Sequence, residues 1–210
     1  MARRRLVSAA IWAAAMIVGG ASFAEAQLCA GGMPFNFAPL QFGVAPAWSE
    51  EGRSAAASAG AGSDHVFGAV TSGWHFGQDD DARVWRVAVD VGTDQPLRVD
   101  NRLRVCPVLT VVAARRADRS SAAAGGHVAV GWVARNVAGL LVVPTASLGL
   151  RHRAEHAASQ NPLEHAIEMD AGLGVILNAR IAVTPRVTVA WPRRFARTTT
   201  FALSTHVGFR

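Results

Sequence analysis

The sequence has no lysine and no tyrosine, and it has few cysteines and no long apolar run. All 21 of its Lys and Arg residues are arginines, and it holds two cysteines. The missing lysine and tyrosine indicate a GC-rich genome more than a function. A membrane-spanning helix needs about 20 consecutive apolar residues, so the lack of such a run excludes a transmembrane helix.

The net charge is positive, but its distribution argues against nucleic-acid binding. The whole chain carries a formal charge of +6. Proteins that follow a phosphate backbone gather their basic residues into a patch or stripe. Here most arginines stand singly along the regular segments, so we expect no nucleic-acid partner.

The first 26 residues have the features of a cleaved signal peptide. Three arginines at positions 3–5 precede an apolar stretch, 6–18, and an A-x-A site at 24–26 places cleavage before Gln27. The alternative is an uncleaved anchor, which the shortness of the apolar stretch disfavours. Export would place Cys29 and Cys106 in an oxidising compartment, where a pair of cysteines usually forms a disulfide.

Most of the remaining chain alternates between apolar and polar residues, which is the period of a β-strand. The clearest case is 180–209, where two alternating strands flank a polar turn. Such alternation predicts nine strands: 37–46, 64–76, 84–91, 102–114, 127–135, 140–151, 164–177, 180–191 and 198–209.

A soluble β-sandwich also alternates, but two features favour a barrel in a membrane. Most predicted strands run to about ten residues, near the 9–11 that cross a bilayer at a tilt. Over the second half of the chain the links alternate between long ones, 115–126 and 152–162, and short ones at Asn136 and 178–179, as in outer-membrane barrels. Trp74, Trp132 and Trp191 lie near strand ends, where interfacial aromatics are expected.

A strand-built domain in lipid must close, because every backbone polar group needs a partner. Bacterial barrels have even strand numbers, and nine candidates leave two solutions. We expect an antiparallel up-and-down transmembrane barrel of eight strands over 64–210, with 27–63 as an N-terminal segment that includes at most one strand. The alternative is ten strands, with a weak strand in the Gly/Ala/Ser-rich segment 49–63, which otherwise forms a loop.

The polar face of the strands would line a narrow lumen. Because unpaired charges are costly in such a space, we expect them to offset one another and to leave no wide channel. The predicted lumenal charges are Arg86, Asp90, Arg102, Arg104, Glu164, Glu168, Asp170, Arg180 and Arg186. Arg180 and Arg186 would meet the carboxylates of the preceding strand.

The alternating strands, the signal peptide and the ending 204–210 resemble the small Gram-negative outer-membrane β-barrel proteins. That family ends in an aromatic residue that the barrel-assembly machinery recognises. Phe209, preceded by apolar Val207, Leu203 and Phe201, is similar to this assembly signal, although Arg210 follows it. The resemblance implies an outer-membrane location, contact with outer-membrane lipid and the assembly machinery as a partner; it implies no activity.

The residues indicate little chemistry. His152, Glu155, His156 and Ser159 permit the hypothesis of a lipid hydrolase, but no nucleophile motif surrounds Ser159. His152 and His156 have the spacing of a metal pair on a helix, yet no further ligand accompanies them. We therefore expect a monomeric structural or surface-interaction barrel with no catalytic residues, metal or cofactor. A narrow pore for small solutes and a lipid-modifying enzyme are the alternatives.

Overall fold

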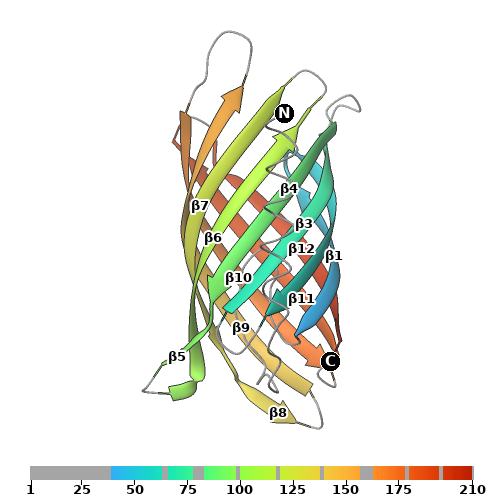
Figure 1. The fold of residues 1–210 in the computed structure, drawn as a ribbon, viewed down its shortest axis with the longest axis vertical. Coiled ribbons are helices and arrows are strands. Elements are labelled where there is room, and N and C mark those ends of the chain that lie inside the picture. Colours follow the sequence, from blue (N-terminus) through green and yellow to red (C-terminus); the bar gives the residue numbers. More distant parts are fainter. Residues whose placement is uncertain are drawn as a thin grey trace, which may run out of the picture.

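The computed structural model describes residues 39–209 apart from short gaps, and all of its regular secondary structure is β-strand (Figure 1). The gaps are 63–65, 78–82, 98–99, 117–118, 138–139, 157–162, 178–179 and 194–195. The predicted signal peptide and Cys29 lie outside the described residues. Within the described part, no helix is long and apolar enough to cross a membrane.

The strands follow one another along the chain and are antiparallel to their neighbours. They are β1 (Leu40–Ser49), β2 (Gly52–Gly62), β3 (Val66–Gly77), β4 (Arg83–Thr93), β5 (Gln95–Leu97), β6 (Asp100–Arg115), β7 (Ser120–Trp132), β8 (Arg135–Val137), β9 (Leu140–His156), β10 (Leu163–Leu177), β11 (Ile181–Pro192) and β12 (Thr198–Phe209).

Ten of these strands close into a barrel. Each wall strand pairs with the next, β9 pairs with β10, and the last strand, β12, pairs with β1. The short β5 and β8 pair with β6 and β9 and lie at the end of the barrel where the chain's C-terminus lies (Figure 1). The prediction of an all-β antiparallel barrel is confirmed. The preferred count of eight wall strands is wrong, and the alternative of ten is the one observed.

The two additional wall strands are β1 and β2, which lie N-terminal to the predicted barrel start at residue 64. The segment predicted as a loop, 49–63, contains the whole of β2, which is hydrogen-bonded to β1 on one side and β3 on the other. Its alanines alternate between exposed and half-buried positions. Small Ala, Gly and Ser side chains carry almost no contrast in polarity, so a strand made of them lacks the alternation that sequence analysis relies on.

The connections are also shorter than predicted. The expected loop 115–126 is largely β7, and β9 continues to His156, well into the expected loop 152–162. Ser120–Gly126 is again a run of small residues, which hides the strand. The connections at the two ends of the barrel therefore do not fall into a short class and a long class.

The alternation that predicted the strands corresponds to the outside and inside of the barrel. Every long strand except β2 carries large apolar residues that are exposed, among them Leu109, Leu150 and Phe201 at 69%, 58% and 57%. Their sequence neighbours point inward, and many are buried, such as Val108, Gly149 and Ser204. A soluble sandwich would bury the apolar face and expose the polar one. This barrel does the reverse, as a wall surrounded by lipid requires.

The wall strands are strongly staggered. A path that starts at Glu164 on β10 and steps from each residue to its partner on the next strand returns to β10 at Ile176. The return point is twelve positions further along the strand (from 164 to 176). The path runs through Arg153, Ala123, Val112, Ala88, Thr71, Ser58, Gly43, His206 and Ala182. A stagger of this kind goes with strands tilted by about 35–45°. Residues close together in the lumen can therefore be far apart along the strands.

Candidate functional site

The lumen has two parts, which differ in how well side chains fill them. We call the end of the barrel at the β1–β2 turn the mouth, and the end where β1 begins and β12 ends the terminal end. A cavity of about 400 Å³, the mouth cavity, opens toward the β1–β2 turn. The rest of the lumen, toward the terminal end, contains the most deeply buried side chains of the barrel.

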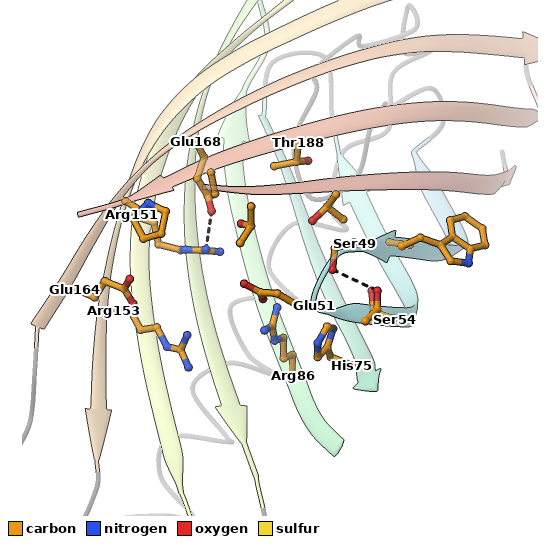
Figure 2. A pocket seen from close by; sticks show the side chains of 18 residues that line it. Ser49, Glu51, Ser54, His75, Arg86, Arg151, Arg153, Glu164, Glu168 and Thr188 are labelled. Atoms are coloured by element: carbon orange, nitrogen blue, oxygen red, sulfur yellow. Dashed lines mark hydrogen bonds and ion pairs between the residues drawn. The ribbon is translucent and has the colours of Figure 1, made fainter. Parts of the chain in front are cut away.

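Charged side chains from several strands surround the mouth cavity (Figure 2). Its charged or titratable lining consists of Glu51, His75, Arg86, Arg151, Arg153, Glu164 and Glu168. Between them the wall consists mostly of small residues, together with Trp48 and Pro192; the small ones are Ala47, Ser49, Gly52, Ser54, Ala166, Thr188, Ala190, Thr198 and Thr200. Short side chains on the wall leave the space that the long charged side chains only partly occupy.

One tight ion pair organises the cavity wall. Arg151 on β9 lies 2.6 Å from Glu168 on β10, and both side chains keep partial contact with solvent. Arg86, on β4, is more exposed and points into the same cavity (Figure 2). The cavity thus combines three arginines with three glutamates, which suits a small polar or zwitterionic group better than an apolar one.

Asp170 is the centre of the polar network just below the cavity. Its carboxylate accepts hydrogen bonds from Ser147, with Oγ 3.0 Å from Oδ2, and from the hydroxyl of Thr188. Arg186 Nε lies 3.7 Å from Oδ1 of the same carboxylate. One side chain therefore joins three strands, β9, β10 and β11, through charge-assisted hydrogen bonds.

Rings lying over glycines fill the lumen toward the terminal end. The ring of His206 lies so close to Gly43 that a Cβ at residue 43 would be 2.0 Å from it, and His206 Nε2 is 3.3 Å from Ser58 Oγ. The ring of Phe67 covers Gly92 in the same way, with 2.4 Å to a Cβ there. Glycine exposes the backbone of a strand, and an aromatic ring can cover it.

Two small apolar clusters complete what we call the packed half of the lumen. One joins Phe67, Cys106, Val108 and Ala129, and the other joins Val143, Ile176 and Ala182. Buried polar residues lie among them, including Asp90, whose Oδ1 accepts a hydrogen bond from the Thr110 hydroxyl. Cys106 is fully buried. Its disulfide to Cys29 stays a prediction, because Cys29 lies outside the described residues.

The structure places the predicted lumenal charges at several levels. Arg86, Glu164 and Glu168 line the mouth cavity, and Asp170 and Arg186 lie below it. Asp90 is in the packed half.

The remaining predicted residues lie toward the terminal end. Arg104 is 3.8 Å from Asp94, and Arg102 is an exposed residue on β6. Arg180 is exposed in the turn after β10, at the opposite end of that strand from Glu164, so the structure does not bring these two together. Phe209 faces outward and packs edge-on against Phe42, with ring centroids 5.8 Å apart.

Four charged or titratable cavity residues are missing from the predicted lumenal charges, namely Glu51, His75, Arg151 and Arg153. Arg153 was hidden because β9 extends past the predicted strand end at residue 151. Glu51 lies in a hairpin turn that the sequence suggested was a long loop, and His75 belongs to the least regular predicted strand. Extending the alternation of β9 by one more inward position would have identified Arg153.

Of the four residues of the hypothetical hydrolase, only His152 has a described side chain, so the hypothesis stays untested. His152 lies on the outer face, where its Nδ1 is 2.5 Å from that of His165. Ser159 lies outside the described residues, and so do the side chains of Glu155 and His156. Among the described residues, no three His, Cys, Asp or Glu side chains are grouped as ligands for a metal ion.

These observations define a class of protein: a closed antiparallel barrel with an apolar exterior and a polar, partly filled lumen is built to span a membrane. No family model matches the chain, and no curated protein matches it. Among solved structures, the β domain of the Bordetella autotransporter BrkA is similar, with a TM-score of 0.56 at 12% identity over 81% of this chain and 98% of that one.

Two other structures overlap less closely. The N-terminal barrel domain of Pseudomonas aeruginosa OprF and the neisserial surface protein NspA both have TM-scores of 0.41 at 10% identity. The matches cover 88% of this chain and 100% of OprF, and 81% of this chain and 96% of NspA. Because both TM-scores are below 0.5, the fold assignment depends on the BrkA domain alone. The chain has the fold of the Gram-negative outer-membrane β-barrels, as its sequence predicts.

Proposed function

We propose that this protein is a monomeric outer-membrane barrel with a structural or surface-interaction role, with a charged mouth and no continuous wide channel. The observation that supports this best is the packed half of the lumen. His206 and Gln41 are each 2% exposed there, and Val143, Thr184 and Cys106 are fully buried. A ten-stranded wall encloses more space than an eight-stranded one, and these inward side chains occupy that space below the mouth cavity.

The exterior supports the membrane assignment. Outward apolar residues run from Phe42 and Phe209 at the terminal end to Trp48, Trp74 and Trp85 near the mouth. An apolar band between aromatic rims matches the way a barrel wall meets lipid. We propose outer-membrane lipid as the partner of this surface and the barrel-assembly machinery as the partner of Phe209. The terminal end would then face the periplasm and the mouth cavity the exterior.

We propose a role without catalysis or cofactor for the mouth cavity. Ser54 and His75 are neighbours across β2 and β3 in the cavity. A nucleophile and its base should be joined by a hydrogen bond. None joins this pair in the described part of the chain. Nor does the lining offer the positive stripe that a nucleic acid would need.

Conductance in planar bilayers tests the proposal. The wild-type barrel, refolded and inserted, should give no steady single-channel steps above the bare bilayer. Phe67→Ala combined with His206→Ala, which removes both rings of the packed half, should raise the frequency of open events. Steady, uniform steps from the wild type would contradict the proposal and favour the narrow-pore alternative. Absence of the folded, heat-modifiable species from outer-membrane fractions would refute the barrel's location.

A further inference from the structure

Four outward-facing side chains form one continuous row on the outer wall next to the mouth. Trp48 on β1 pairs with Arg53 on β2, Arg53 pairs with Phe76 on β3, and Phe76 pairs with Arg83 on β4. We call these four residues the rim patch. Aromatic and cationic side chains thus alternate across four neighbouring strands.

The rim patch is hollowed and accessible. A surface cleft of about 470 Å³ is lined by all four residues together with Ser49, Gly52 and Gly77. Trp48, Arg53 and Arg83 are exposed and Phe76 is half-buried. The guanidinium carbon of Arg83 lies 6.0 Å from the centre of the Phe76 ring, within the range of a cation–π contact. Glycines at 52 and 77 keep the floor of the cleft open.

Both arginines of the rim patch are available for an external anion. Among the described residues, no carboxylate lies within ion-pair distance of Arg53 or Arg83. Glu51, two residues before Arg53, lines the mouth cavity inside the barrel instead (Figure 2). At these positions the outer wall therefore presents two exposed guanidinium groups beside two aromatic rings.

The depth of the rim patch fits the headgroup region of a bilayer. Toward the middle of the barrel it is followed by the outward pair Trp74 and Trp85, then by Ser72 and Val87, and then by Val70 and Val89. This order runs from an apolar band through aromatic residues to arginines, and it places the guanidinium groups where lipid phosphates lie.

We propose that Trp48, Arg53, Phe76 and Arg83 bind the phosphate-bearing sugar headgroup of a glycolipid in the outer leaflet. Guanidinium forks form paired hydrogen bonds with phosphate oxygens, and aromatic faces pack on sugar rings and on the first methylenes of acyl chains. An ordinary phospholipid would use the arginines but would leave the aromatic faces without a sugar to cover. This assignment rests on the proposed outer-membrane location with the mouth outward.

Native mass spectrometry of the refolded full chain tests this site, with diphosphorylated lipid A added to the detergent. The wild type should retain one bound lipid A, and Arg53→Gln combined with Arg83→Gln should weaken that binding about tenfold, the loss of one to two charged hydrogen bonds. The matched control, Arg115→Gln with Arg193→Gln, removes the same charge from other exposed positions on the same rim and should bind as the wild type does. Trp48→Ala should also weaken binding.

Four outcomes would overturn the inference. The first is that the folded wild-type barrel retains no lipid A, and the second is that both double variants lose the same amount of lipid A binding. The third is that Trp48→Ala binds lipid A as the wild type does. The fourth is that the wild type binds phosphatidylglycerol as well as it binds lipid A. The last would mean a general phosphate contact instead of a glycolipid site. Each of these leaves the proposed function intact, because that proposal fails only if the barrel conducts steadily or is absent from the outer membrane.

Discussion

The two halves of the lumen share the same ten strands, yet one is open and the other is filled. Around the mouth cavity the wall residues are small and the long side chains are charged. In the packed half the inward positions hold rings and branched side chains, such as Phe67, His206, Val143 and Ile176. The difference shows that strand number sets the width of a barrel, whereas the size of inward side chains decides whether that width is usable.

The two halves also use charge differently. At the mouth, the Arg151 and Glu168 side chains are 39% and 26% exposed, so water screens their attraction. Deeper in, the Asp170 side chain is 23% exposed, a fraction similar to that of Glu168, but two hydroxyl groups hold it in addition to Arg186. Ion pairs at the mouth should therefore contribute to binding more than to stability, and the network at Asp170 should do the opposite.

The largest effect should come from crowding the packed half. Gly43→Val places a side chain where the His206 ring already lies, 2.0 Å from the Cβ position. Overpacking on this scale should cost about 3 kcal/mol of unfolding free energy, measured by urea titration of the refolded barrel. Adding His206→Ala should recover much of the loss. Gly126→Ala is the control, since its Cβ meets nothing closer than 3.4 Å; equal losses at the two glycines would refute the packing described.

A smaller effect should follow removal of the carboxylate at Asp170. Asp170→Ala leaves Ser147, Thr188 and Arg186 without their shared acceptor, and should cost about 2 kcal/mol in the same titration. Asp170→Asn, which keeps an acceptor oxygen, should cost less. An unfolding midpoint unchanged by the alanine would mean that Asp170 does not hold the three strands together.

The smallest effect should come from the mouth. Glu168→Ala breaks the ion pair with Arg151 in a partly solvated cavity, so it should change stability by about 0.5 kcal/mol or less. High salt should reduce even that difference, because exposed charges are screened. If Glu168→Ala were as destabilising as Asp170→Ala, the distinction between an open mouth and a packed half would be wrong.

The sequence predicted the features that depend on contrast between neighbouring residues. The strands with alternating large apolar and polar residues, such as β11 and β12, were identified with nearly correct bounds and faces. The strand β2 and the start of β7 were missed because Ala, Gly and Ser differ too little in polarity to mark a face. The wrong strand count followed directly from that omission.

The site was less predictable than the wall, because it depends on register. Which lumenal charges meet is decided by the stagger between strands. It brings Arg186 to Asp170 but leaves Arg180 at the far end of β10 from Glu164. The mouth cavity itself combines residues from distant strands, for example Arg86 on β4 and Arg151 on β9. No pattern within a single strand contains that information.

Two matched cysteine substitutions on β12 test the division of the lumen most directly. Thr200 and Ser204 both face inward on this strand; Thr200 lines the mouth cavity, whereas Ser204 is buried in the packed half. Each is changed to cysteine in a chain whose two native cysteines are alanine, and the folded barrel is treated with a small charged thiol reagent. Rapid labelling of Thr200→Cys with almost none of Ser204→Cys is the predicted result, and equally rapid labelling of both would contradict a lumen closed below its mouth.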